Sequence, residues 1–123
     1  MIVGLGTDIV EILRLERVYT RFGRRFLEKI LTPRELDTLP ATPATTVAGR
    51  FAAKEAAVKA LGTGFSRGIT PLHIEITRSS RGAPKMTFLG KAKELELAIG
   101  IRRSLLSISH ERTVAVAVVI LEA

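Results

Sequence analysis

The 123-residue sequence predicts one α+β domain in which a mainly antiparallel sheet packs on a long central helix. Apolar segments typical of strands stand near both ends of the chain, and an alanine-rich helical segment occupies its middle. The segments follow the order β-α-α-α-β-β-α-β-β, which is typical of an α+β or α/β sandwich. Because the chain is short and contains no linker or repeat, we expect residues 1–123 to form a single domain.

The composition indicates a globular protein with an anionic partner. Hydrophobic residues make up 46% of the sequence, and no apolar run approaches the roughly 18 residues of a membrane span. The formal net charge is +7, which favours nucleic acid, a membrane surface, a phosphorylated ligand or an acidic protein as partner. The chain has no cysteine, which excludes disulfides and thiolate chemistry and favours the cytoplasm.

The first strand is predicted at residues 2–12, where isoleucine and valine dominate. Gly4 and Gly6 within it indicate close approach by another backbone or a ligand. Asp8 is the unusual residue, because a carboxylate in a buried strand costs several kcal/mol unless it is paired or metal-bound. A strand-end Asp that caps the next helix is the alternative, and both interpretations stay open.

A basic helical segment is predicted at residues 13–30, with a break at Gly23. Its apolar stripe is Leu13, Leu15, Val18 and Phe22. The basic residues around that stripe are Arg14, Arg17, Arg21, Arg24, Arg25 and Lys29. The segment is either a solvated amphipathic helix or a docking surface for an acidic partner, to which Leu15 and Val18 could add an apolar contact.

The central helix is introduced by a short capped helix and a polar loop. Thr32, Pro33 and Glu35 have the spacing of a capping box with proline in the first turn. Residues 40–46 follow as a loop, and Thr45 or Thr46 is the expected cap of the central helix. Four apolar residues recur at helical spacing in that helix and predict a buried stripe: Val47, Phe51, Val58 and Leu61.

Glu55 and Lys59 lie four residues apart and therefore on one face of the central helix. Gly62 and Gly64 end this helix, because glycine readily takes the left-handed conformation of a helix stop. A carboxylate, an ammonium group and a glycine-rich exit together suit a metal and a phosphate. A surface helix with one ordinary Glu–Lys pair is the alternative.

Four further strands and one helix are predicted after residue 64. They are strands at 72–77, 85–89, 104–109 and 113–121 and a helix at 90–100. The first of these strands alternates apolar and polar residues and should be half exposed. The last is apolar nearly throughout, which predicts a central position in the sheet.

Four motifs in chain order resemble the holo-acyl-carrier-protein synthases. They are the opening strand at 4–12, the helix at 49–64, the Gly-x-Pro hairpin at 82–84 and the Ser-x-Ser-His strand end at 107–110. The resemblance implies transfer of 4′-phosphopantetheine from coenzyme A to a serine of an apo acyl carrier protein, in fatty acid biosynthesis. It also implies release of adenosine 3′,5′-bisphosphate, a Mg²⁺ cofactor, and a homotrimer with active sites between subunits.

The resemblance also implies roles for individual residues. It assigns Mg²⁺ to Asp8 and Glu55 and catalysis to these two carboxylates together with Lys59. The residues implied to bind coenzyme A are Arg50, Lys59, Gly62, Pro84, Ser109 and His110. Those implied to dock an acidic carrier protein are Arg14, Arg21 and Arg25. The base that takes the serine proton is Glu55, directly or through a metal-bound water, or Asp8.

The sequence departs from the family in two respects and leaves two other classes to consider. Residues 70–73 stand where the family often has an aromatic residue followed by an aspartate, ahead of its Ile-Glu-Ile strand. Residues 41–45 lack the basic pair that the family often carries ahead of the signature helix. A nucleic-acid-binding module would explain the positive charge, but one tyrosine and no tryptophan leave few stacking platforms. A dinucleotide-binding protein would explain Gly4-x-Gly6, but the third glycine of that fingerprint is missing.

Overall fold

The computed structural model describes residues 1–123 and contains two antiparallel sheets. The larger has three strands in the order β1-β5-β4, and the smaller is the β2–β3 hairpin. The elements are β1 (Ile2–Glu11), α1 (Ile12–Phe22), α2 (Arg24–Ile30), α3 (Pro33–Asp37), α4 (Ala44–Leu61), a 3₁₀ turn (Pro71–His73), β2 (Ile74–Arg78), β3 (Pro84–Phe88), α5 (Gly90–Ile99), β4 (Arg103–His110) and β5 (Val114–Glu122). The α+β class and the central position of the last strand in the larger sheet are confirmed. The element order differs in one place: four helices and a 3₁₀ turn, and not three helices, separate β1 from β2, because the break at Gly23 divides the basic segment into α1 and α2.

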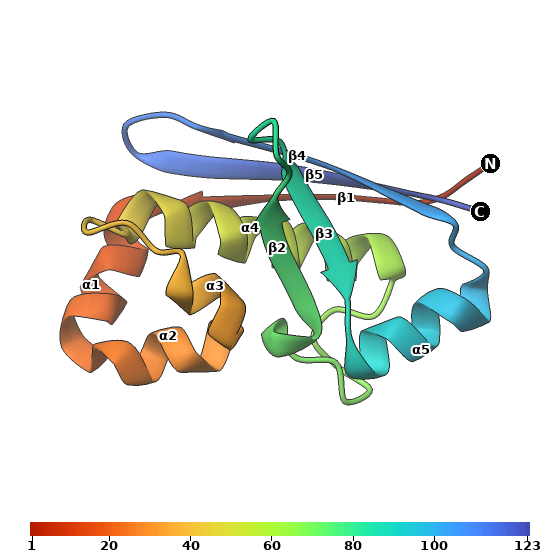
Figure 1. Ribbon diagram of the computed structural model, residues 1–123, viewed down its shortest axis with the longest axis horizontal. Helices are drawn as coiled ribbons and strands as arrows, with labels where there is room; N and C mark the ends of the chain where they lie inside the picture. The colour runs from red at the N-terminus through yellow and green to blue at the C-terminus, as the bar shows by residue number, and fades with distance from the viewer.

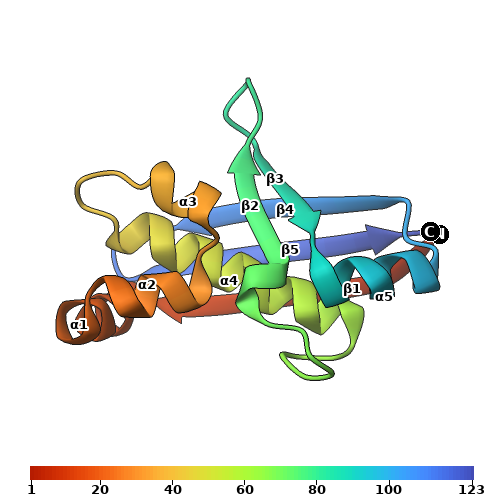
Figure 2. The same cartoon turned by 60° about the horizontal axis from the view of Figure 1, so that its bottom comes forward.

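Helix α4 is the central element of the fold. It runs along the three-stranded sheet, with α1, α2 and α3 gathered near its N-terminal end and α5 near its C-terminal end (Figure 1). The β2–β3 hairpin stands across the helix and projects beyond the body of the molecule (Figure 2). None of the helices is both long and apolar enough to cross a membrane.

Alanine allows α4 to be enclosed on nearly all sides. Ala52, Ala53, Ala56 and Ala57 are fully buried in the main hydrophobic core. Side chains this small let the strands and the hairpin approach the helix backbone closely. The surface-helix alternative is therefore wrong, although Glu55 and Lys59 do share one face.

The caps of α4 agree with prediction at one end only. Gly62 ends the helix in the left-handed conformation, with φ of 81°. At the other end Pro43 occupies the cap position without a side-chain hydrogen bond, so the expectation of a Thr45 or Thr46 cap is wrong. Both threonines lie inside the first turn, because proline fixes a φ that suits the start of a helix.

The strand β1 lies unusually close to α4. A Cβ atom on Gly6 would overlap the carbonyl oxygen of Ala56, and one on Gly4 would overlap that of Ala60. The predicted close approach of another backbone at these glycines is confirmed. Only this face of β1 is covered, however: Leu5 and Ile9 on the other face are 67% and 63% exposed. In the single chain, the expectation of a buried strand holds for one face.

Three other expectations need correction. The predicted single sheet is two sheets, since the hairpin does not join β4 in a common ladder. The hairpin's first strand begins at Ile74 and not at residue 72, because a 3₁₀ turn capped by Thr70 covers Pro71–His73. In α1 the buried residues are Ile12 and Leu15. Leu13 and Phe22, which belong to the predicted apolar stripe, are each 55% exposed.

We predict that Gly6→Ala destabilises the protein by about 1–3 kcal/mol or more, because the added methyl group must push β1 away from α4. Urea unfolding measures the change. Thr7→Ala is the matched control on the exposed face of the same strand and should cost less than about 0.5 kcal/mol. Equal effects of the two substitutions would show that the contact between β1 and α4 is not close.

Candidate active site

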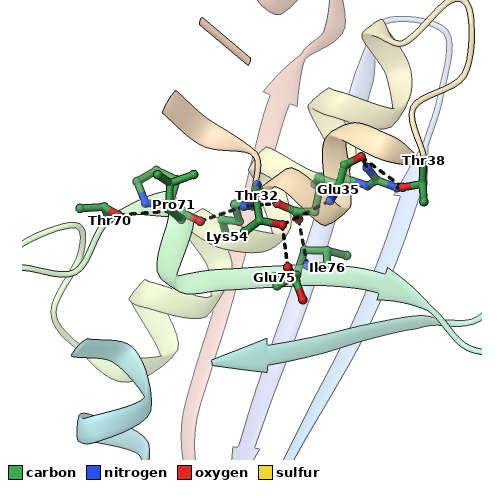
Figure 3. Close-up of polar contacts among 10 residues, drawn as sticks. Thr32, Glu35, Thr38, Lys54, Thr70, Pro71, Glu75 and Ile76 are labelled. Carbon is green, nitrogen blue, oxygen red and sulfur yellow. Dashed lines mark hydrogen bonds and ion pairs between the residues drawn. The ribbon is translucent and has the colours of Figure 1, made fainter. Parts of the chain in front are cut away.

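A buried ion pair fixes the elements that carry the site. Lys54 Nζ lies 2.7 Å from Glu35 Oε1, and both side chains are fully buried. The Glu35 carboxylate also accepts hydrogen bonds from the backbone N–H of Thr32 (2.7 Å) and of Ile76 (2.8 Å). Lys54 donates a second bond to the carbonyl of Pro71 (2.8 Å) (Figure 3). One carboxylate thus joins α3, α4 and β2.

Arg50, one turn before Lys54, belongs to the same network. Its guanidinium donates to the Glu35 carbonyl (2.8 Å) and to Thr38 Oγ1 (3.1 Å). Burial lowers the pKa of Arg50 below its usual value, Glu35 opposes this, and the positive charge of Arg78 adds to it. Burial likewise lowers the pKa of Lys54, against the opposing effect of Glu35. Both charges are therefore stabilised by their hydrogen-bond partners within the protein and not by water.

The two predicted carboxylates come together in a hollow of about 730 Å³ between β1, α1 and α4. Asp8 and Glu55 both line it, and Lys59 lies beside them. Lys59 Nζ donates to Asp8 Oδ1 (3.1 Å) and to the carbonyl of Thr7 (3.0 Å). Phe51, expected in the core, is half-buried and lines the same hollow together with Arg14.

The electrostatics of this hollow suit a divalent cation. Burial raises the pKa of Glu55, the Asp8 carboxylate raises it further, and Lys59 opposes both. None of the ion pairs in the chain includes Glu55. Glu11 also lines the hollow, but no group of three His, Cys, Asp or Glu side chains is placed to hold a metal ion. Mg²⁺ commonly uses one or two carboxylates and completes its shell with phosphate oxygens and water.

A second cleft of about 300 Å³ lies between the start of α4, the hairpin and the end of β4. Three predicted coenzyme A contacts line it, namely Arg50, Pro84 and His110. The sequence did not single out Thr45, Thr46 or Arg78 as site residues, although they line it too. The alternation of β2 could have identified Arg78, because Arg78 follows Ile74 and Ile76 at alternate positions and so lies on the same face of the strand.

Four of the remaining predicted residues, Gly62, Ser109, Arg21 and Arg25, lie outside both hollows. Gly62 is twelve positions beyond Arg50 on α4, about 18 Å along the helix axis, and Ser109 is exposed on β4. In a single chain, the residues expected to bind coenzyme A are therefore not gathered in one place. Arg21 and Arg25 are exposed near the turn at Gly23, and Arg14 is exposed at the rim of the Asp8 hollow.

Comparison with known proteins places the chain in the class of phosphopantetheinyl transferases. A model of the 4′-phosphopantetheinyl transferase superfamily matches residues 4–119. Within that superfamily, the chain belongs to the holo-[acyl-carrier-protein] synthase family. It is 54% identical over 123 residues to the synthase of Desulfovibrio desulfuricans, which covers 100% of this chain and 99% of the relative. It is 56% identical to that of Maridesulfovibrio salexigens over 99% of both chains.

Solved structures of the family share the fold. The synthase of Neisseria meningitidis superimposes with a TM-score of 0.92 at 39% identity over 100% of both chains. That of Helicobacter pylori in complex with coenzyme A gives 0.86 at 37% identity, covering 96% of this chain and 99% of the other. That of Bacillus anthracis in complex with coenzyme A (3′,5′-ADP) gives 0.81 at 38% identity, covering 100% and 98%. These similarities bear out the predicted family.

We predict that Lys54→Met destabilises the protein by about 3–5 kcal/mol, because it leaves the Glu35 carboxylate buried without its cation. The double variant Glu35→Gln/Lys54→Met should lose less free energy of unfolding than the sum of the two single variants, by about 0.5–3 kcal/mol. Urea unfolding of the four proteins gives this coupling. Lys93→Met removes an exposed pair with Glu96 and serves as the control, with an expected cost of less than about 1 kcal/mol. Strict additivity at Glu35 and Lys54 would contradict the assigned pair.

Proposed function

We propose that the protein transfers the 4′-phosphopantetheine group of coenzyme A to a serine of an apo acyl carrier protein. The transfer releases adenosine 3′,5′-bisphosphate and serves fatty acid biosynthesis. The observation that carries this proposal is the meeting of Asp8, Glu55 and Lys59 at one hollow in a chain of this family. The first test is mass spectrometry of an apo carrier protein incubated with this chain, coenzyme A and Mg²⁺. A gain of one phosphopantetheine supports the function, and an unchanged carrier mass contradicts it.

In this proposal Asp8 and Glu55 hold Mg²⁺. When bound there, the ion would neutralise charge on the pyrophosphate of coenzyme A and orient it for transfer. Burial raises the pKa of Glu55, and the nearby Asp8 carboxylate raises it further. This repulsion supports the assignment, since a bound cation would compensate it. Lys59 would remain next to both groups and place a positive charge where the leaving phosphate gains negative charge.

Glu55 is the proposed acceptor of the serine proton. Its carboxylate is half-buried and takes part in no ion pair, whereas that of Asp8 is occupied by Lys59 at 3.1 Å. Asp8 then acts mainly through the metal and through the position of Lys59.

The coenzyme A assignment favours an oligomer. The two hollows open on different parts of one chain, and only the second contains Arg50, Pro84 and His110. We propose a homotrimer in which the second cleft of one subunit faces the carboxylates of its neighbour, with Ser109 and Gly62 contributing at the contact. The exposed apolar face of the larger sheet, with Leu5, Ile9, Leu105 and Val118, supports this assembly. The proposed location of the enzyme is the cytoplasm.

The proposed docking surface for the acidic carrier protein is the outer side of α1 and α2. Arg14, Arg21 and Arg25 are exposed there. Leu15, expected to add an apolar contact, is instead buried in the core, because its neighbours Ile12 and Tyr19 form the inner stripe of α1. Leu13 and Phe22 are exposed beside the arginines and take over that role.

We predict that Asp8→Asn and Glu55→Gln each reduce transfer at least 100-fold while the fold stays intact, because each removes a proposed Mg²⁺ ligand. Mass spectrometry of the carrier measures transfer, and circular dichroism checks the fold. Binding of Mn²⁺, measured by electron paramagnetic resonance, should weaken in both variants in the presence of coenzyme A. Either variant with near-normal activity at low Mg²⁺ would refute the metal assignment.

We predict that Arg14→Glu and Arg21→Glu raise KM for the carrier protein about tenfold or more and leave KM for coenzyme A nearly unchanged. Charge reversal weakens electrostatic steering of an acidic partner, and this effect should fade with salt as screening over about 8 Å sets in. Glu16→Gln, an exposed acidic position on the same helix, is the control and should not raise KM for the carrier. Unaltered carrier kinetics in both reversed variants would exclude this surface as the docking site.

A further inference from the structure

The second cleft carries positive charge without a carboxylate to balance it. Arg50, Arg78 and His110 line the cleft, and no Asp or Glu is among its lining residues. None of the ion pairs in the chain includes Arg50 or Arg78. A hollow whose arginines are not balanced by any lining carboxylate is complementary to an anion.

The strand register explains why Arg78 faces this cleft. Ile74, Ile76 and Arg78 occupy alternate positions of β2 and therefore lie on one face of the hairpin. Ile74 and Ile76 are buried in the core. Arg78 lies on the same face of β2, beyond the edge of the core, and there it lines the cleft. Its cross-strand partner is Pro84, which lines the same cleft and offers no charge.

The two guanidinium groups differ in how they are held. Arg50 is fixed by two bonds, to the Glu35 carbonyl and to Thr38 Oγ1, and neither acceptor is a carboxylate. Arg78 makes a single bond of 3.4 Å to the carbonyl of Gly82 and is otherwise exposed. The charge of Arg78 lowers the pKa of the partly buried Arg50, so the two cations repel each other. An anion between them would replace this repulsion with attraction.

We infer that Arg78, together with Arg50, binds the 3′-phosphate of coenzyme A, an inference that rests on the proposed function. A phosphate monoester carries close to two negative charges at neutral pH and is the most concentrated charge on coenzyme A. A guanidinium presents paired N–H donors that match phosphate oxygens. Residues 41–46 supply no Lys or Arg to the cleft, so the hairpin supplies the second cation. Arg78 thus selects coenzyme A over its 3′-dephospho form.

Calorimetry with two nucleotides tests the inference on the intact protein. Adenosine 3′,5′-bisphosphate and adenosine 5′-monophosphate differ only in the 3′-phosphate, so the ratio of their Kd values measures its recognition. In Arg78→Ala this ratio should fall about tenfold or more, as expected for loss of a charge-assisted hydrogen bond. Arg78→Lys should fall between Arg78→Ala and the wild type. Arg81→Ala is the matched control, since Arg81 is exposed on the same hairpin and does not line the cleft.

Transfer kinetics provide the second measurement. The ratio of kcat/KM for coenzyme A to that for 3′-dephospho-coenzyme A should fall about tenfold or more in Arg78→Ala and keep its wild-type value in Arg81→Ala. An Arg78→Ala protein that retains the wild-type ratios in both assays overturns the inference and leaves the proposed function standing. Equal loss in Arg78→Ala and Arg81→Ala also overturns it, because it would indicate long-range charge alone. A wild-type protein that transfers from neither substrate refutes the proposed function itself.

Discussion

The carboxylate of Glu35 is buried with Lys54, and the arrangement of the second cleft depends on this pair. A lysine and a glutamate enclosed this completely are tolerated only when both are paired and hydrogen-bonded. Here the carboxylate also receives the backbone N–H groups of Thr32 and Ile76, and the ammonium group reaches Pro71. The short helix α3, the central helix and the hairpin are therefore held in one arrangement. Arg50 and Arg78, which lie on two of these elements, acquire their relative positions from it.

Much of the fold follows from signals that are local in the sequence, and so does the candidate carboxylate pair. The capping box at Thr32, the break at Gly23 and the stop at Gly62 each depend on a few neighbouring residues, and the structure contains all three. Asp8 stood out because a carboxylate is unusual in a strand of isoleucine and valine. Asp8 can lie close to Glu55 because two glycines on β1 and the alanines of α4 let the strand approach the helix. These small residues were apparent in the sequence.

What could not be predicted depends on contacts distant in the chain. Nothing near Glu35 shows that its side chain is buried against Lys54, nineteen positions away. The exposure of Leu13 and the burial of Leu15 were misjudged because only packing against α4 and α2 selects the inner face of α1. Arg78 looks like one of several arginines in a polar hairpin until β2 is placed across the central helix. Tertiary packing, and not local pattern, decides these cases.

The geometry of α4 also explains why one chain divides the proposed substrate contacts between two hollows. Each residue advances about 100° around a helix, so Arg50 and Glu55 project about 140° apart. Arg50 and Lys54 share one side and face the hairpin, while Glu55 and Lys59 share another and face β1. A single ligand that touches Arg50 and the carboxylates would have to pass around the buried helix. In the proposed trimer, a neighbouring copy that presents its own Arg50 cleft to Asp8 and Glu55 would remove this difficulty, and the exposed apolar face of the larger sheet would give such a copy a surface to pack against.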